Sequence, residues 1–170
     1  PNLFKCPIMS INFLKPKKLI LIDHNEFGIY KLIQFIEELE FTNTDIKYLL
    51  GNIQDKIFIL NTLKKDNVKI LFHAAAYKHV PLVEDNFMQA IRNNVFSTKS
   101  ICEAAIESEL SNVVLISTDK AVRPTNIMGS TKRISELIFQ ASNSKVNQIH
   151  FSKTSKKTLF SIVRFGNVLG

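Results

Sequence analysis

Apolar residues in this 170-residue chain alternate between short continuous runs and stretches with helical spacing. The run at 17–23, KKLILID, is aliphatic and ends in an acid, which predicts a strand. The stretch at 26–40 places apolar residues three and four positions apart, which predicts a helix. The same pair of patterns recurs along the chain, so the sequence indicates repeated strand–helix units.

The same patterns assign the remaining elements. Strands are predicted at 45–51, 68–76, 112–118 and 158–165, and helices at 56–65, 87–108 and 127–142. A polar stretch rich in Ser and Lys, 142–157, is expected to connect the last helix to the last strand. Continuously apolar strands separated by helices indicate a parallel sheet covered on both faces. The predicted fold class is therefore α/β, a Rossmann-like doubly wound parallel sheet.

The composition fits one domain with a substantial core, because 45% of the residues are apolar and thirteen are Phe. Cys6 and Cys102 are far apart in sequence, and Cys102 lies in a predicted helix. Neither a disulfide framework nor a zinc site is therefore indicated, and a reducing cytoplasm fits. His73 and His79 have no third ligand at a metal-like spacing, so we expect no metal.

The formal net charge of +7 could indicate an anionic partner. The lysines are scattered and not interleaved with aromatic residues, which favours a solvated basic surface or an anionic small substrate over a nucleic acid. No run reaches the roughly 18 to 20 apolar residues of a membrane span, and the first segment lacks the layout of a signal peptide. We expect a cytoplasmic location for this chain.

Ligands of doubly wound sheets bind outside the carboxyl ends of the strands. Four polar or Gly-bearing segments fall at those ends in this sequence. They are Asp23, HAAAYKHVP at 73–81, STDK at 117–120 and RFGNVLG at 164–170. Because four such segments at one edge are unusual for a plain scaffold, this edge is the predicted site.

Individual residues at this edge allow two interpretations. Asp23 could accept both ribose hydroxyls of an adenine dinucleotide, or it could cap the helix that begins near Glu26. The small residues at 74–76 could let a flat ring or a pyrophosphate approach the backbone, or could serve tight packing of a helix on the sheet. Lys132 lies one turn after Met128 on the same helix face. It could hold a nicotinamide ribose, or it could be one more exposed lysine.

Three longer motifs carry a family resemblance: FHAAAYKHVPLVEDN at 72–86, ISTDKAVRPTNIMGSTKR at 116–133 and VRFGNVLG at 163–170. They resemble the polysaccharide-biosynthesis (CapD-like) branch of the extended short-chain dehydrogenase/reductase superfamily, the UDP-N-acetylglucosamine 4,6-dehydratases. The resemblance runs from about residue 17 to 170. It implies NAD as the cofactor, a UDP-N-acetylhexosamine as the substrate, and precursors of surface polysaccharide or glycan as the products.

The resemblance also implies how the proton chemistry is divided. Oxidation of the sugar at C4 removes a proton from O4, loss of water needs a base at C5 and an acid at O6, and hydride then returns to C6. Thr118 would handle the O4 proton, Asp119 would be the acid and Lys120 the base. Met128 stands where the wider superfamily has its catalytic Tyr, which is common in this branch. The structural alternative for Asp119 and Lys120 is a salt-bridged turn.

Binding residues follow from the resemblance in the same way. Lys132 would bind the nicotinamide ribose and Asp23 the adenosine ribose. Asn94 matches a helix asparagine that bridges to the backbone near the site, and Ser97 stands where the family usually has Gly. The other candidates are Asn52 and Ile53 near the adenine, Ala74, Ala75 and Ala76 beside the cofactor, and Tyr77, Lys78, His79 and Asn167 in the substrate pocket.

The sequence departs from the family pattern at both ends. The family begins with a strand and a glycine-rich phosphate loop, whereas the first glycine here is Gly28. We therefore expect residues 1–16 to have no family counterpart, and 17–170 to be a partial NAD-binding domain without that strand and loop. The C-terminal substrate lobe is expected to be absent, so the chain would be a fragment.

Other functions compete with the dehydratase. A UDP-sugar 4-epimerase needs the same C4 oxidation but neither the acid nor the base, so the presence of both Asp119 and Lys120 favours the dehydratase. The chain could instead be a catalytically silent remnant or an interaction module. An unpaired sheet edge would favour association, which leaves a homo-oligomer open. Full-length relatives often carry membrane helices, but this chain shows no span.

Overall fold

The computed structural model describes residues 5–39, 41, 43–150 and 157–166. These residues form two compact units, one ending at Ile53 and the other beginning at Gln54. Each unit contains a parallel sheet flanked by helices, which confirms the predicted α/β class.

The first unit has a two-stranded parallel sheet. Its elements are α1 (Lys5–Phe13), β1 (Lys18–Asp23), α2 (Glu26–Glu38) and β2 (Asp45–Leu50). β1 and β2 pair in register from Lys18↔Asp45 to Asp23↔Leu50, so the two strands end together. Apolar residues of α1, β1 and α2 form its core. We had predicted no element before residue 17, so α1 is an addition to the expected order.

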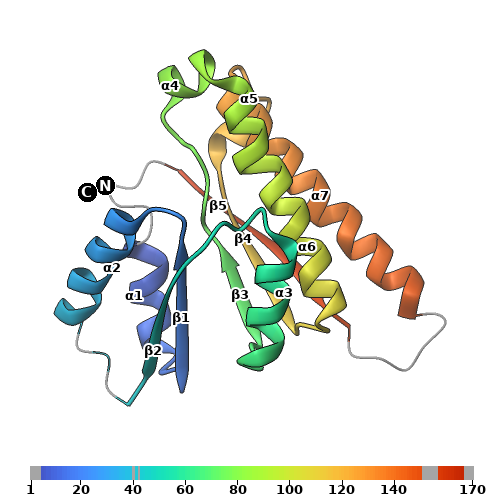
Figure 1. The fold of residues 1–170 in the computed structure, drawn as a ribbon. Coiled ribbons are helices and arrows are strands. Elements are labelled where there is room, and N and C mark those ends of the chain that lie inside the picture. The colour runs from blue at the N-terminus through green and yellow to red at the C-terminus, as the bar shows by residue number, and fades with distance from the viewer. Residues whose placement is uncertain (1–4, 40, 42, 151–156, 167–170) are drawn as a thin grey trace. The chain divides into compact units, whose positions relative to one another are not determined.

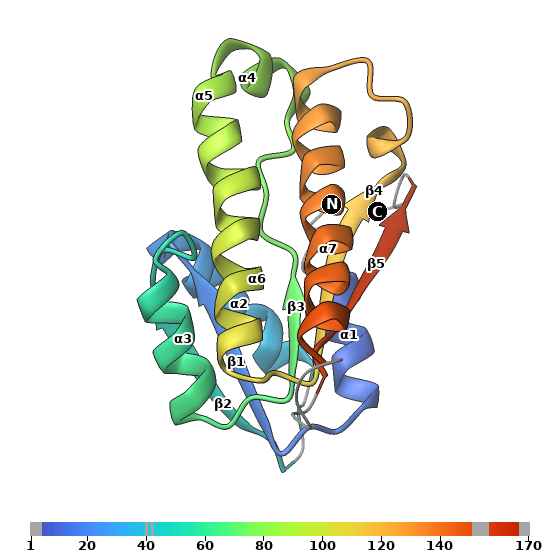
Figure 2. The ribbon, with the colours of Figure 1, turned by 90° about the vertical axis from the view of Figure 1, so that its right-hand side faces the viewer.

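The second unit has a three-stranded parallel sheet in the order β3-β4-β5. Its elements are α3 (Lys56–Lys65), β3 (Ile70–His73), α4 (Val80–Asp85), α5 (Phe87–Ala90), the π-helix η1 (Ile91–Phe96), α6 (Ser97–Glu107), β4 (Asn112–Thr118), the 3₁₀-helix η2 (Asp119–Ala121), α7 (Ile127–His150) and β5 (Leu159–Phe165). Helices α6 and α7 run side by side along this sheet (Figures 1 and 2).

Helix α7 is longer than its polar sequence predicted. It continues to His150, whereas we expected a connecting segment from residue 142. Ser142 and Val146 are buried one and two turns beyond the buried Phe139, so the inward face of the helix persists. Asn143 also bonds to the backbone N–H and C=O of Phe160 in β5 (3.1 and 2.8 Å), which ties this part of α7 to the sheet.

The helix predicted at 87–108 contains a π-turn. Elements α5, η1 and α6 follow one another as a single rod (Figure 2). A π-turn changes the backbone hydrogen-bond pattern, and such turns are frequent at functional sites. The carbonyls in this turn also accept from hydroxyls: Asn93 O from Ser97 Oγ, and Asn94 O from Thr98 Oγ1 at 2.6 Å and Ser135 Oγ at 2.9 Å.

Strand β3 is shorter than predicted, since it ends at His73 and not at residue 76. The three alanines that follow form part of a loop leading to α4. The backbone N–H and C=O of Tyr77, at the far end of these alanines, bond to the side chain of Asn94. Side-chain bonds from η1 therefore replace strand pairing at the end of this segment.

Candidate active site

The turn after β4 brings Thr118, Asp119 and Lys120 into mutual contact. Thr118 Oγ1 donates to Asp119 Oδ1 (2.9 Å) and accepts from the backbone N–H of Lys120 (3.3 Å). Lys120 Nζ lies 3.4 Å from the same Asp119 oxygen. About half of the Asp119 side chain is exposed, at 54%, so the turn is salt-bridged and at the same time accessible to a ligand.

The hydroxyl of Thr118 holds the pKa of Asp119 below its usual range, and the ammonium of Lys120 adds to this effect. Asp119 is therefore a carboxylate at neutral pH. A general acid needs a proton, so the turn would have to be covered for Asp119 to serve as one. Covering would remove water from both side chains and disfavour both charges.

Gly129 brings helix α7 against this turn. A Cβ atom at this position would lie 2.3 Å from the backbone oxygen of Lys120, which is far inside van der Waals contact. The first turn of α7 is held by two further contacts: Asn126 Oδ1 accepts from Gly129 N, and Glu84 Oε1 from Ile127 N, both at 2.7 Å. The absent side chain of Gly129 thus permits the close approach of α7 and the turn.

Met128 points into the protein and not toward solvent. It is 5% exposed and packs with Val83 and Ala90. A thioether has no proton to transfer, so its contribution here is packing.

Lys132, one turn further along α7, is also buried, at 6% exposure. Its Nζ donates to the backbone oxygen of Ile116 in β4 (2.7 Å). Burial lowers the pKa of Lys132 to about 8, although the carboxylate of Glu136 opposes this shift. The alternative of one more exposed lysine is therefore wrong.

His73 ends β3 as a buried neutral side chain. Burial, followed by the nearby charge of Lys132, lowers the pKa of His73 to about 3. Its Nε2 lies 2.9 Å from Thr98 Oγ1. Thr98 Oγ1 also lies within hydrogen-bond distance of Asn94 O (2.6 Å) and of Ser135 Oγ (3.2 Å), so His73 joins a buried polar network. The part of the chain that the structure describes contains no group of three residues suited to a metal ion.

Asn94 makes the backbone bridge that the resemblance implied. Its Oδ1 accepts from Tyr77 N (2.7 Å), and its Nδ2 donates to Tyr77 O (3.1 Å) and to Thr131 Oγ1 (3.0 Å). Asn94 thereby fixes the loop that carries the candidate substrate residues. The side chains of Tyr77, Lys78 and His79 project from this fixed backbone and are exposed.

Asp23 lies at the end of β1 in the first unit, with 15% of its side chain exposed. Asn25 is the N-cap of α2, and Asp23 Oδ1 accepts instead from the backbone N–H of Asn25 (2.9 Å). The capping alternative for Asp23 is therefore wrong. A Cβ at Gly28 would lie 2.7 Å from Asp23 Oδ2, so the glycine leaves room for this carboxylate. Asn52 is exposed and Ile53 half-buried just after β2.

The remaining candidates are placed as follows. Ala74, Ala75 and Ala76 are half-buried in the second unit, in the loop after β3. Asn167 lies outside the described residues.

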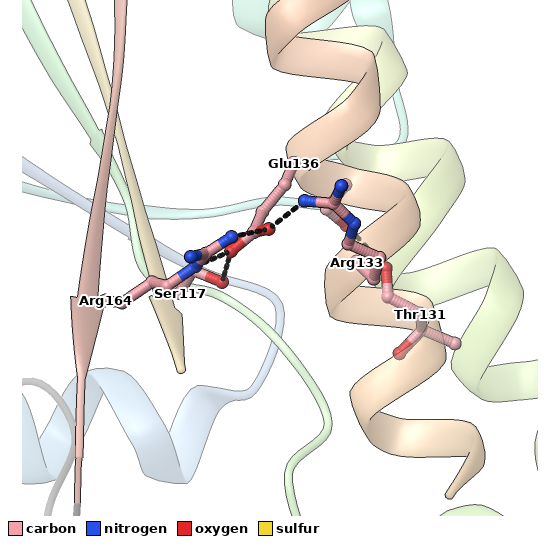
Figure 3. A network of polar contacts seen from close by, with 6 residues as sticks. Ser117, Thr131, Arg133, Glu136 and Arg164 are labelled. Carbon is pink, nitrogen blue, oxygen red and sulfur yellow. Dashed lines mark hydrogen bonds and ion pairs between the residues drawn. The ribbon is translucent and has the colours of Figure 1, made fainter. Parts of the chain in front are cut away.

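Sequence reasoning missed several polar residues of α7 and its neighbours. Thr131, Ser135 and Glu136 are buried beside Lys132, and Glu136 bonds to Ser117 of β4 and Arg164 of β5 (Figure 3). Positions 128, 131, 132, 135, 136 and 139 lie on one face of a helix, so this spacing was the available signal. It was obscured because polar residues usually indicate a solvated face.

Parallel strands with intervening helices, and polar residues at the carboxyl ends of β1 and β4, define a Rossmann-type α/β fold. The sequence model of the family described as "Polysaccharide biosynthesis protein" matches residues 6–170. The chain therefore belongs to this family. The match includes residues 6–16, part of the leading segment for which we expected no counterpart.

The chain is also similar in sequence to individual proteins of known name. The chain is 43% identical over 161 residues to the capsular polysaccharide biosynthesis protein CapD of Staphylococcus aureus, covering 95% of this chain and 25% of CapD. It is 33% identical to a UDP-N-acetylglucosamine 4,6-dehydratase (inverting) of Campylobacter jejuni, covering 92% of this chain and 42% of the relative. It is 32% identical to a UDP-glucose 4-epimerase of Rickettsia bellii, covering 90% and 43%. The chain thus spans less than half of each.

Solved structures share the fold. Pen from Bacillus thuringiensis superimposes with a TM-score of 0.82 at 30% identity, covering 99% of this chain and 49% of Pen. DesIV of Streptomyces venezuelae, a dTDP-glucose 4,6-dehydratase with bound NAD, gives 0.75 at 17% identity, covering 95% and 50%. Within the described residues of this chain, no helix is long and apolar enough to cross a membrane.

Proposed function

We propose that this chain supplies the catalytic turn of a UDP-N-acetylhexosamine 4,6-dehydratase that makes precursors of surface polysaccharide. The observation that carries this proposal is the contact of Thr118, Asp119 and Lys120 with one another. Met128 on the adjoining helix α7 is buried and has no proton to transfer, so the turn is left to do the proton chemistry. Relatives named as dehydratases and as polysaccharide biosynthesis proteins support it.

Each of the two units contains a residue whose chemistry suits binding of NAD. In the first unit, the Asp23 carboxylate at a strand end suits ribose hydroxyls, and Gly28 leaves it room. In the second unit, the buried amine of Lys132 would hold the nicotinamide ribose. The sequence contains no glycine-rich loop for the pyrophosphate, so we expect these 170 residues alone to bind NAD weakly. When bound, NAD would accept a hydride from C4 of the sugar and return it to C6.

The three residues of the turn would divide the proton chemistry. As C4 is oxidised, Thr118 would relay the proton that leaves O4 to Asp119, to which its hydroxyl already donates. Lys120, once neutral, would remove the proton from C5, and Asp119 would protonate O6 as the C6–O6 bond breaks and water departs. The proton gained by Lys120 would return to C5 as hydride returns to C6, so that the net change is the loss of one water. The loop held by Asn94 would present Tyr77, Lys78 and His79 to the sugar nucleotide.

The test uses a chimera, because the chain spans 42% of the Campylobacter dehydratase. Residues 6–170 would replace the matching segment of that enzyme, and the isolated chain would be assayed in parallel. With UDP-N-acetylglucosamine and NAD, we expect the chimera to form a 4-keto-6-deoxy product, detected as the loss of one water by mass spectrometry.

Two variants of the chimera assign the roles. Lys120→Ala should still reduce NAD when substrate is added but should form product roughly 10² to 10⁴ times more slowly, as is typical when a positioned base is lost. Met128→Leu is the matched control and should keep most activity, since Met128 only packs. Loss of turnover in Met128→Leu with full activity in Lys120→Ala would show that the turn does not do the chemistry.

A UDP-sugar 4-epimerase is the second candidate, because a relative of 32% identity bears that name. Epimerisation at C4 changes no mass and needs neither Asp119 nor Lys120. The same assay separates the two, since an epimerase would return the 4-epimer of the substrate with its water retained.

A further inference from the structure

Glu136 is a buried carboxylate that the proposed chemistry does not use. Its side chain has no exposed surface, and its two oxygens accept bonds from three elements (Figure 3). Ser117 Oγ of β4 donates at 2.8 Å, and Arg164 of β5 donates through Nε and Nη2 at 2.8 and 2.7 Å. Arg133 Nη1, on α7 itself, donates at 3.0 Å.

These bonds act next to the candidate catalytic turn. Ser117 and Arg164 are register partners in neighbouring strands, and Ser117 directly precedes Thr118. Lys132, one turn before Glu136 on α7, holds the backbone oxygen of Ile116. Side chains of α7 thus fix two consecutive residues of β4 immediately before the turn.

Lys132 has few groups that can balance its charge. The titratable groups that interact with it are His73 on β3 and Glu136 on α7, and Glu136 in turn binds Arg133 on α7 and Arg164 on β5. Lys132 also bonds to Ile116 of β4, and the Asp119–Lys120 pair follows this strand. His73 is neutral, both arginines are cations, and the Asp119–Lys120 pair is exposed and shares one contact. Of the described residues, Glu136 alone is a buried carboxylate.

Glu136 itself is ionised, because Arg164, Ser117 and Arg133 lower its pKa to about 2. A buried ammonium has lost most of its hydration and depends on such a neighbour to stay charged. Without the carboxylate, Lys132 would lack the one buried anion among the described residues, and Arg133 and Arg164 would lose the anion that they bind.

We propose that Glu136 is a positioning residue of this site, which holds the ends of β4 and β5 against α7 and keeps the amine of Lys132 positively charged. One consequence of this proposal rests on the proposed function, namely that the cationic amine of Lys132 would be ready to bind the nicotinamide ribose. The electrostatic part is a property of the chain alone.

The test therefore uses the 170-residue chain without cofactor or substrate. Lysines labelled with a stable isotope at Cε are titrated by NMR, and the Lys132 signal is identified by its loss in Lys132→Met. The wild-type signal should titrate at about pH 8. In Glu136→Gln, which keeps the shape of the side chain, the proton dissociation constant of Lys132 should rise at least about tenfold.

Two further variants make the result specific. Arg164→Gln removes the cation that binds Glu136 and leaves more of the carboxylate's charge to act on Lys132, so it should shift the titration of Lys132 the opposite way, to higher pH. Glu103→Gln, on the exposed face of α6 beside Lys99, is the matched control and should leave it unchanged.

An unchanged Lys132 titration in folded Glu136→Gln would overturn the proposal and leave Glu136 as a mechanical clamp. If Glu136→Gln does not fold, Arg164→Gln decides: a shift to higher pH supports the proposal, and no shift or a shift to lower pH overturns it. Failure of the chimera to make product would leave these titrations unaffected, so the two ideas fail separately.

Discussion

Two polar regions of the second unit, the inward face of α7 and the turn after β4, are built in opposite ways. The inward face of α7 buries Thr131, Lys132, Ser135 and Glu136, and each has a partner on another element. The turn after β4 leaves Asp119 and Lys120 about half exposed, in contact with each other and with Thr118. A buried polar group is costly unless it is bonded, whereas an exposed one is solvated with or without its partner.

This difference separates structural from chemical roles. Residues of the buried region are expected to control stability, and their loss would impair function indirectly. The side chains of the exposed turn are expected to contribute little to folding, which fits the reactive role that we propose for them. Both regions contain charged residues that a list of motifs alone would treat alike.

The largest expected effect on stability is at Asn94 of η1, which is buried and bonds to Thr131 on the inward face of α7. Asn94→Ala removes the bonds to Tyr77 N, Tyr77 O and Thr131 Oγ1 and leaves these groups without that partner. The free energy of unfolding should fall by about 3 kcal/mol, measured by urea denaturation, because each unsatisfied buried group costs about 1–3 kcal/mol.

Asn93→Ala is the matched control for this substitution. Asn93 is the preceding residue in η1 and makes one side-chain bond, to Asn94 Oδ1 at 3.1 Å. The loss of this one bond should lower the free energy of unfolding by clearly less than Asn94→Ala does. Equal effects of the two substitutions would show that the bridge from η1 to the Tyr77 loop does not stabilise the unit.

A smaller effect should appear in the pH dependence of the free energy of unfolding, and it should arise from His73. Its pKa is about 3 in the folded chain, against an ordinary value of 6.5, so the unfolded chain binds a proton first as pH falls. Stability is therefore complete above pH 6.5 and declines as pH drops toward 3. The slope is about 1.4 kcal/mol per pH unit, or about 2 kcal/mol between pH 6.5 and 5.

His73→Gln should remove this slope, and His79→Gln, which changes an exposed histidine, should leave it in place. Denaturant melts at several pH values between 5 and 6.5 measure both. Glu136 does not interfere, because its lowered pKa acts between 4.5 and about 2. A slope that persists in His73→Gln would mean that His73 does not titrate as a buried group.

Much of the fold, and the position of the exposed turn, could be predicted from the sequence. The α/β class, the bounds of α3 and β4, and the position of the Thr118–Lys120 turn followed from apolar runs and from strand ends. These features depend on local patterns, in which a strand end and the polar loop after it are adjacent in the chain.

The buried polar face of α7 could not be predicted in the same way. Glu136 and Ser135 resemble a solvated face until Arg164 and Asn94, which are distant in sequence, are placed against them. The π-turn was hidden for the same reason, because hydroxyls including that of Ser135, 41 residues away, accompany it. Partners that are far apart in the chain leave no periodic signal.

The smallest expected effect on stability is at the exposed turn, and it sharpens the comparison most. Asp119→Asn and Lys120→Ala each remove an exposed contact that water replaces, and Thr118 keeps its bond to the backbone N–H of residue 120. The melting temperature of the chain should be unchanged within measurement error by differential scanning fluorimetry. The same substitutions in the chimera should slow product formation roughly 10² to 10⁴ times, since the acid or the base would be missing. A marked loss of melting temperature would place the turn with the buried region as a structural element, and its proposed chemistry would then lose its main support. Unchanged stability with lost turnover is the result expected of side chains that serve the reaction.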